Sequence, residues 1–109
     1  MSNLKMRDKM RFTVNMLGFR KTYDMTPEDI VRNVAYNMAG LYENDYLDGY
    51  RDSPISEEEF SHEVYDAMMR DNIEMFDDGS GWIMPTPKEV RFLGRAGIER
   101  IACEVLRAY

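Results

Sequence analysis

The residues best suited to nucleophilic catalysis are the single cysteine and the single histidine, Cys103 and His62. A cysteine nucleophile needs a base close enough to take its proton. Cys103 lies between Ala102 and Glu104, beside the apolar stripe of a predicted helix, where cysteine usually packs as a small unreactive residue. His62 is surrounded in sequence by acidic residues, which is typical of a solvated helix face. We therefore expect no enzymatic activity.

Acidic residues near glycines suggest calcium binding, but their spacing does not fit an EF-hand loop. Such a loop needs a central glycine and a glutamate at its twelfth position. With Gly49 at the centre the twelfth residue is Ile55, and with Gly81 it is Pro87. The adjacent pair Asp77–Asp78 stands in a predicted turn, where neighbouring side chains point apart instead of sharing a proton. Phosphate-loop and dinucleotide motifs are absent, so we expect no metal and no cofactor.

The net charge of −6 is distributed unevenly along the 109 residues. Residues 1–23 contain six lysines and arginines and one aspartate, a net charge of +5. Residues 24–78, the acidic helical middle, contain sixteen acidic residues and three arginines, a net charge of −13. Residues 79–109 carry +2. An acidic middle indicates a positively charged partner. The alternative is that its carboxylates only solvate helix faces.

Length and composition are those of one globular domain. The apolar fraction of 44% and the charged fraction of 31% are ordinary globular values. A single cysteine excludes an internal disulfide, which fits a reducing compartment. No apolar run is long enough to cross a membrane, and charges occupy the N-terminal stretch where a signal peptide would be apolar. We therefore expect a cytoplasmic protein.

Apolar spacing and capping residues predict the first three helices. Apolar residues from Met6 to Leu17 recur at helical intervals and Gly18 follows, which predicts a basic helix within residues 1–23. Thr26 is the predicted N-cap of a second helix that runs to about residue 48. Ser56, followed by a glutamate three residues later, predicts a capping box at the start of a third helix.

A β-hairpin is predicted after the third helix. Apolar and polar residues alternate over Ile73–Phe76, which is the spacing of a strand. Trp82–Met84 is a short run of bulky apolar residues, which is also typical of a strand. The glycine-containing segment Asp77–Gly81 between them favours a turn. The predicted hairpin therefore covers residues 73–84.

A last helix is predicted over residues 86–108. Thr86 is its expected N-cap, Pro87 its first residue and Glu89 the capping-box partner. The predicted fold is therefore mostly α, of the α+β class, with three to four helices. One hairpin separates the last two helices, and residues 1–109 form one domain.

Residues 56–93 carry a resemblance to a known class of proteins. Ser56–Phe60 opens a helix, and Met69–Ile73 leads from it into a strand. Asp78–Ile83 forms a turn, and Met84–Lys88 begins the next helix. This stretch resembles the small winged-helix proteins of bacteria and their phages. The resemblance implies a winged-helix fold, whose third helix enters the DNA major groove while the wing touches the backbone.

The residue types on those two surfaces depart from the winged-helix pattern. Contacts to phosphates supply much of the affinity for DNA and need cations. Here the corresponding helix is acidic, with Arg70 as its one arginine, and the wing carries Asp77 and Asp78. DNA phosphates would repel such a surface, so the usual mode of docking on DNA is not expected.

We therefore predict a non-catalytic protein-interaction module that presents an acidic face to a basic protein surface. One version is a phage or mobile-element inhibitor with an anti-defence role, which places carboxylates where a nucleic-acid-binding protein expects phosphates. The residues predicted to form this face are Asp45, Asp48, Asp52, Glu57, Glu58, Glu59, Glu63, Asp66, Asp77 and Asp78.

The alternative prediction is a winged-helix transcriptional regulator that binds DNA through cations outside the acidic middle. The candidate DNA-binding residues are Lys5, Arg7, Lys9, Arg11, Arg20, Lys21, Arg91 and Arg95. The ten methionines cannot all point inward, which predicts a homodimer formed through a methionine-rich apolar patch. No membrane partner is expected.

Overall fold

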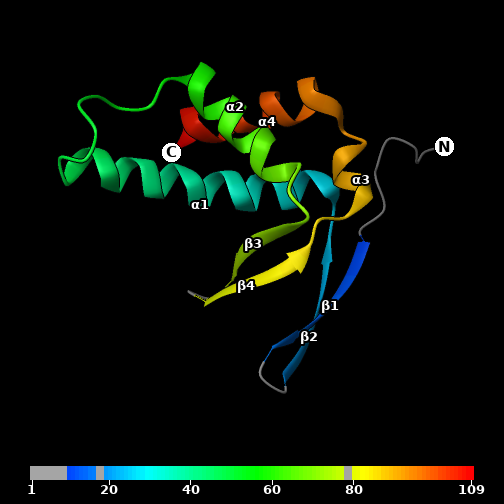
Figure 1. The fold of residues 1–109 in the computed structure, drawn as a ribbon. Coiled ribbons are helices and arrows are strands. Elements are labelled where there is room, and N and C mark those ends of the chain that lie inside the picture. The colour runs from blue at the N-terminus through cyan, green and yellow to red at the C-terminus, as the bar shows by residue number, and fades with distance from the viewer. Residues whose placement is uncertain (1–9, 17–18, 78–79) are drawn as a thin grey trace.

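The part of the chain that the structure describes forms two β-hairpins, three longer helices and one short helical turn (Figure 1). The computed structural model describes residues 10–16, 19–77 and 80–109, with side chains at positions 11, 22, 24–76 and 81–109. In chain order the elements are β1 (Met10–Met16), β2 (Phe19–Met25), α1 (Pro27–Leu47), α2 (Glu57–Met68), β3 (Asn72–Asp77), β4 (Ser80–Pro85), α3 (Lys88–Arg91) and α4 (Gly94–Ala108).

The N-terminal region is a hairpin, so the predicted basic helix within residues 1–23 is wrong where the structure describes it. β1 pairs with β2 in antiparallel register, from Met10 opposite Met25 to Met16 opposite Phe19. Residues 10–16 alternate strictly between apolar and polar, which is the strand period. The helical spacing of a few methionines concealed that alternation. The rest of the prediction, including Lys5, Arg7, Lys9 and Gly18, lies outside the described residues.

Helix α1 begins and ends as its sequence predicts. Thr26 Oγ1 accepts a hydrogen bond from the Asp29 N–H at 3.1 Å, and Asp29 Oδ2 accepts one from the Thr26 N–H at 3.4 Å. These two bonds form a capping box, with Pro27 at the first helical position. The helix ends at Leu47, and Gly49 continues with a φ of 86°, a conformation that favours glycine.

Helix α2 has half of the predicted capping box. Ser56 Oγ accepts from the Glu59 N–H at 3.1 Å, as expected. The Glu59 carboxylate does not complete the box, because it accepts a hydrogen bond from Arg51 at 3.0 Å. All four residues of the apolar stripe of α2 are buried. They are Phe60, Val64, Ala67 and Met68.

The second hairpin confirms the prediction for residues 73–84 to within one residue at each end. β3 pairs antiparallel with β4 from Asn72 opposite Pro85 to Asp77 opposite Ser80. At its base, the Thr86 N–H donates to the Asp71 carbonyl at 2.9 Å and the Thr86 hydroxyl donates to the Arg70 carbonyl at 2.6 Å. Thr86 therefore fastens the hairpin to the end of α2.

The predicted last helix, residues 86–108, is divided into α3 and α4. Thr86 is not its N-cap, because that hydroxyl is used at the hairpin. Pro87 occupies the cap position of α3 without a side-chain hydrogen bond, so the predicted capping box with Glu89 is wrong. Gly94 has a φ of 76° and turns the chain between the two helices.

The core lies where the three longer helices meet the second hairpin. α4 packs against both α2 and α1, and α1 packs against β3. The largest fully buried side chains include Phe60, Ile30, Met68, Met75 and Ile98. Figure 1 shows the β1–β2 hairpin extending away from this helical layer. The mostly helical class is confirmed, as is a hairpin between α2 and the last helices, and the N-terminal hairpin is an addition to the predicted fold.

Candidate protein-interaction surface

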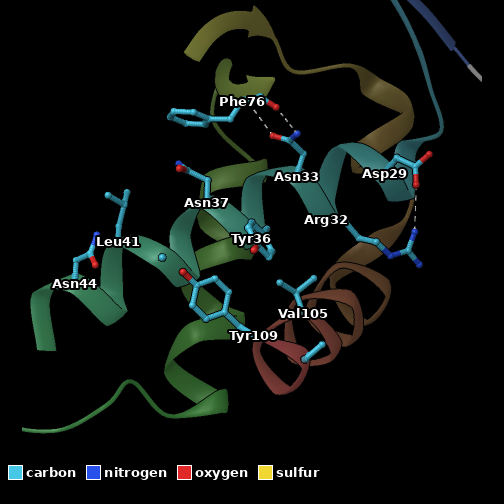
Figure 2. Close-up of a pocket in the computed structure, with 12 residues that line it drawn as sticks. Asp29, Arg32, Asn33, Tyr36, Asn37, Leu41, Asn44, Phe76, Val105 and Tyr109 are labelled. Carbon is cyan, nitrogen blue, oxygen red and sulfur yellow. Dashed lines mark hydrogen bonds and ion pairs between the residues drawn. The ribbon is translucent and has the colours of Figure 1, made fainter. Parts of the chain in front are cut away.

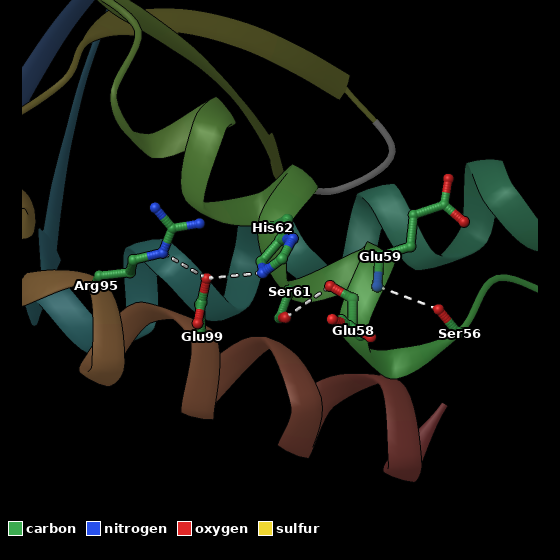
Figure 3. A network of polar contacts seen from close by, with 7 residues as sticks. All are labelled: Ser56, Glu58, Glu59, Ser61, His62, Arg95 and Glu99. Carbon is green, nitrogen blue, oxygen red and sulfur yellow. Dashed lines mark hydrogen bonds and ion pairs between the residues drawn. The ribbon is translucent and has the colours of Figure 1, made fainter.

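His62 on α2 contacts Glu99 on α4. Its Nε2 lies 3.7 Å from Glu99 Oε2 on α4, and Arg95 Nε donates to the same oxygen at 2.9 Å (Figure 3). The hydroxyl of neighbouring Ser61 donates to the backbone carbonyl of Glu58 at 3.0 Å. Histidine, glutamate and arginine thus form a polar contact between α2 and α4. Cys103 is half-buried on α4.

Metal coordination has no geometric basis in the described residues, since none of their histidine, cysteine, aspartate and glutamate side chains form a group of three that could hold an ion.

Arginines neutralise part of the predicted acidic face. Arg107 on α4 holds Glu57 in a two-pronged contact, with Nε and Nη2 each donating at 2.9 Å. These hydrogen bonds lower the pKa of Glu57 and raise the pKa of Arg107. Arg51 binds Glu59, as described above. Glu57 and Glu59 therefore connect elements of the fold instead of presenting free charge.

Glu63 is also engaged within the protein. Its Oε1 accepts a hydrogen bond from the Tyr42 hydroxyl at 3.4 Å. Burial of Tyr42, with the carboxylates of Glu63 and Glu59 as further causes, raises the pKa of that phenol. The guanidinium of Arg51 lies 5.3 Å from the centre of the Tyr42 ring. This cluster closes the α1–α2 connection onto the first turns of α2.

The remaining carboxylates of the predicted face divide into two places. Asp45, Asp48 and Asp52 are exposed around the end of α1 and the following turn. Glu58 and Asp66 are exposed on α2. None of these five forms an ion pair with a residue that the structure describes. Asp77 ends β3 with its side chain undescribed, and Asp78 lies outside the described residues.

The cations predicted for DNA binding are largely occupied where their side chains are described. Arg11 binds Asp24 at 3.2 Å, and Arg95 binds Glu99. Arg91 donates to the Arg70 carbonyl at 2.9 Å and lies 4.0 Å from Asp71. Arg20 and Lys21 are on β2 with undescribed side chains, and Lys5, Arg7 and Lys9 lie outside the described residues.

The methionine-rich patch predicted for a homodimer is not visible among the described side chains. Met68, Met75 and Met84 are buried in the core, and Met25, Met38 and Met69 are half-buried against it. A dimer remains a prediction.

A groove of about 790 Å³ between α1, α4 and the tip of the second hairpin was not predicted from the sequence (Figure 2). One side of α1 forms its floor and Val105, Ala108 and Tyr109 form one wall. Phe76 stands on the opposite side. The only signal in the sequence was the placement of asparagines and Tyr36 on a helix side that a core would have filled with apolar residues.

The aromatic wall of the groove is held by a close approach to glycine. The rings of Tyr36 and Tyr109 meet edge to face with centres 5.1 Å apart. A Cβ atom on Gly40 would lie only 3.0 Å from the Tyr109 hydroxyl. The absence of a side chain at this position therefore lets the phenol rest against α1.

Large apolar side chains stand among the free carboxylates at the end of α1. Leu47, next to Asp48 in the chain, is 69% exposed, and Tyr50, two residues after Asp48, is 82% exposed. Tyr46, beside Asp45, is also exposed. Tyrosine is enriched at the centres of protein interfaces, whereas an ordinary solvated helix face has little reason to expose it.

Comparison of the chain with protein families, with characterised proteins and with solved structures finds no match. Within its described residues, no helix combines the length and the apolar character needed to cross a bilayer.

Proposed function

We propose that the protein is a non-catalytic interaction module that binds a basic protein surface through the end of α1 and the turn after it. The supporting observation is the combination found there: Asp45, Asp48 and Asp52 are exposed without a described cationic partner, and Tyr46 and Tyr50 are exposed among them. The carboxylates make the surface negative and attract a basic partner over long range, while the tyrosines supply apolar contact area.

The distribution of arginines distinguishes this surface from general solvation of helix faces. Glu57 and Glu59, in the first turn of α2, have arginine partners. The aspartates at the end of α1 lie where the helix dipole is negative, so their charges are not offset by the backbone. A cationic partner would relieve this local excess of negative charge.

The partner class that fits best is a nucleic-acid-binding protein, whose cationic groove would accept carboxylates in place of phosphates. An inhibitor encoded by a phage or another mobile element, with an anti-defence role, would work in this way. The order of α1, α2, the β3–β4 hairpin and the following helices supports a winged-helix relationship as part of the same proposal. The cytoplasm is the compartment in which such a partner would be met.

The test is a titration against purified basic nucleic-acid-binding proteins on a biosensor at increasing salt. Replacing all three aspartates, Asp45→Asn, Asp48→Asn and Asp52→Asn, should weaken association about tenfold, because each exposed pair is worth only about 0.2–1 kcal/mol. The matched control is Glu89→Gln, an exposed carboxylate on α3. Association that is absent, or that salt does not weaken, rejects the proposal.

A second candidate, a DNA-binding regulator, is favoured by one observation. The β1–β2 hairpin extends away from the helices and carries Arg20 and Lys21 on one strand (Figure 1). A two-stranded ribbon can enter the DNA major groove. A gel-shift titration distinguishes the two functions, since tight DNA binding that salt weakens steeply would support the regulator.

A further inference from the structure

The Asn33 side chain demonstrates how α1 can hold an extended backbone. Its Nδ2 donates to the Phe76 carbonyl at 2.8 Å, and its Oδ1 accepts from the Phe76 N–H at 3.0 Å (Figure 2). The amide therefore bonds to both polar groups of one strand residue, as a neighbouring β-strand would. The outer edge of β3 is thereby closed at Phe76.

Two further asparagines follow on the same side of α1. Asn37 is four residues after Asn33, and Asn44 is seven residues after Asn37, so all three share one face of the helix. Figure 2 shows them in this order along the groove that both Asn37 and Asn44 line. Neither of these two amides has a hydrogen bond to any residue that the structure describes. Asn37 is half-buried, a position where an amide is normally satisfied.

The walls of the groove provide apolar contacts on both sides of this row of amides. Tyr36 and Tyr109 stand along one side, while Leu41 and Phe76 stand on the other (Figure 2). Successive side chains of an extended peptide point to opposite sides of its backbone. A peptide lying along the asparagines would therefore place its side chains alternately against the tyrosines and against Leu41.

We propose that this groove binds an extended segment of the partner protein, with basic residues at one end. Asn37 and Asn44 would hold its backbone as Asn33 holds Phe76. The basic end follows from Asp45 and Asp48, which are exposed immediately beyond Asn44. This inference rests on the proposed function. It specifies in addition that the bound segment is extended and that its backbone contacts Asn37 and Asn44. A nucleic-acid strand fits less well, because the same aspartates would repel its phosphates.

Nuclear magnetic resonance of the isotope-labelled full chain tests the contact directly, since each asparagine amide gives its own pair of signals. The probe is a short blocked peptide of valines with lysines at one end, called the lysine peptide, compared with one that has glutamates at that end and with an oligoadenylate. We expect the lysine peptide to shift the side-chain signals of Asn37 and Asn44 but not those of Asn33. Unchanged signals, or shifts produced by the oligoadenylate instead, would overturn the proposal.

Substitutions separate this inference from the proposed function. Asn37→Ala should lower affinity for the lysine peptide and for a basic protein partner about tenfold, because two hydrogen bonds are lost. Gly40→Ala should lower both affinities by displacing the Tyr109 phenol. Gly97→Ala is the matched control, since its Cβ would make only an ordinary contact of 3.6 Å with Leu93.

The two failures give different results. In one outcome, replacing Asp45 and Asp48 by asparagine weakens association with the basic protein partner, while Asn37→Ala and Gly40→Ala leave that association unchanged. The groove is then not the peptide site, and the proposed function stands. If neither set of variants changes association with any basic protein, both proposals are rejected. Circular dichroism of each variant verifies that the fold is retained.

Discussion

Asn33 closes the edge of β3 by pairing its side-chain amide with the backbone of Phe76, at 2.8 and 3.0 Å. The residues are 43 positions apart in the chain, and the contact fastens the second hairpin to the side of α1. The same contact blocks one position on an edge that would otherwise be available to another strand.

Removing this amide should loosen the hairpin. Asn33→Ala leaves a partly buried N–H and carbonyl of Phe76 without a partner, which costs about 1–3 kcal/mol. Urea denaturation measures the loss in the free energy of unfolding. Asn44→Ala is the matched control on the same helix, and its exposed amide should give no loss. Equal effects at the two positions would show that the Asn33 contact does not stabilise the hairpin.

The link between Glu57 and Arg107 should appear in the pH dependence of stability. The pKa of Glu57 is lowered from its ordinary value of 4.5 by the hydrogen bonds from Arg107. A lowered pKa in the folded state contributes stability above the unfolded pKa, and this contribution disappears as pH falls through the folded pKa. Wild type should therefore melt at a higher temperature than Glu57→Gln near neutral pH, and the difference should vanish in acid.

The neighbouring residue provides the control for this pH experiment. Glu58 is exposed and has no ion pair in the described part of the chain. Glu58→Gln should leave the melting temperature close to that of wild type across the same pH range. A difference for Glu57→Gln that persists unchanged in acid would mean that the ion pair with Arg107 is not its cause.

Two glycines near the start of α4 should respond oppositely to alanine. Gly94 has a φ of 76°, so Gly94→Ala forces a side chain into the left-handed region and should cost about 1 kcal/mol or more. Gly97 is within α4, where a Cβ meets only Leu93 at 3.6 Å. Gly97→Ala should therefore stabilise by about 0.5–1 kcal/mol through helix propensity. Thermal unfolding should show a lower melting temperature than wild type for Gly94→Ala and a higher one for Gly97→Ala.

The helices α1 and α2 could be predicted from the sequence because capping residues next to their first turns determine where they begin. Thr26 and Ser56 mark the starts of α1 and α2 because their hydroxyls bond to N–H groups three residues later. The N-terminal hairpin was missed because the methionine spacing fits a helix while the full alternation fits a strand. The break at Gly94 was missed because glycine permits a positive φ without requiring one, so its presence in a helical pattern does not locate a turn.

The acidic composition of the candidate surface was predictable, but its pattern of free and paired charges was not. Glu57 and Glu58 are adjacent glutamates. In the described part of the chain, the Glu57 carboxylate accepts hydrogen bonds from an arginine 50 residues later, whereas the Glu58 carboxylate has no ion pair. The groove depends on the approach of α4 to α1, as in the contact of Tyr109 with Tyr36. Contacts of this kind between distant segments leave no periodic signal in the chain.

Arg51 should order the turn that carries the proposed binding residues. It donates to Glu59 at 3.0 Å, lies over the Tyr42 ring, and its N–H donates to the Asp45 carbonyl at 3.2 Å. Arg51→Met removes the first two contacts and makes the surface more negative by one charge. We expect faster hydrogen exchange in residues 48–55, which would report the loss of order.

The effect of Arg51→Met on binding shows whether the negative charge of the surface or the order of the turn after α1 contributes more to association. The added negative charge alone would strengthen association with a basic partner, but an exposed charge contributes at most about 1 kcal/mol. Ordering a turn that presents several side chains costs about 0.5–1.5 kcal/mol for each side chain immobilised. Weaker association is therefore expected, although the variant is more acidic. Tighter association in the biosensor titration would show that the net charge of the surface outweighs the order of the turn after α1.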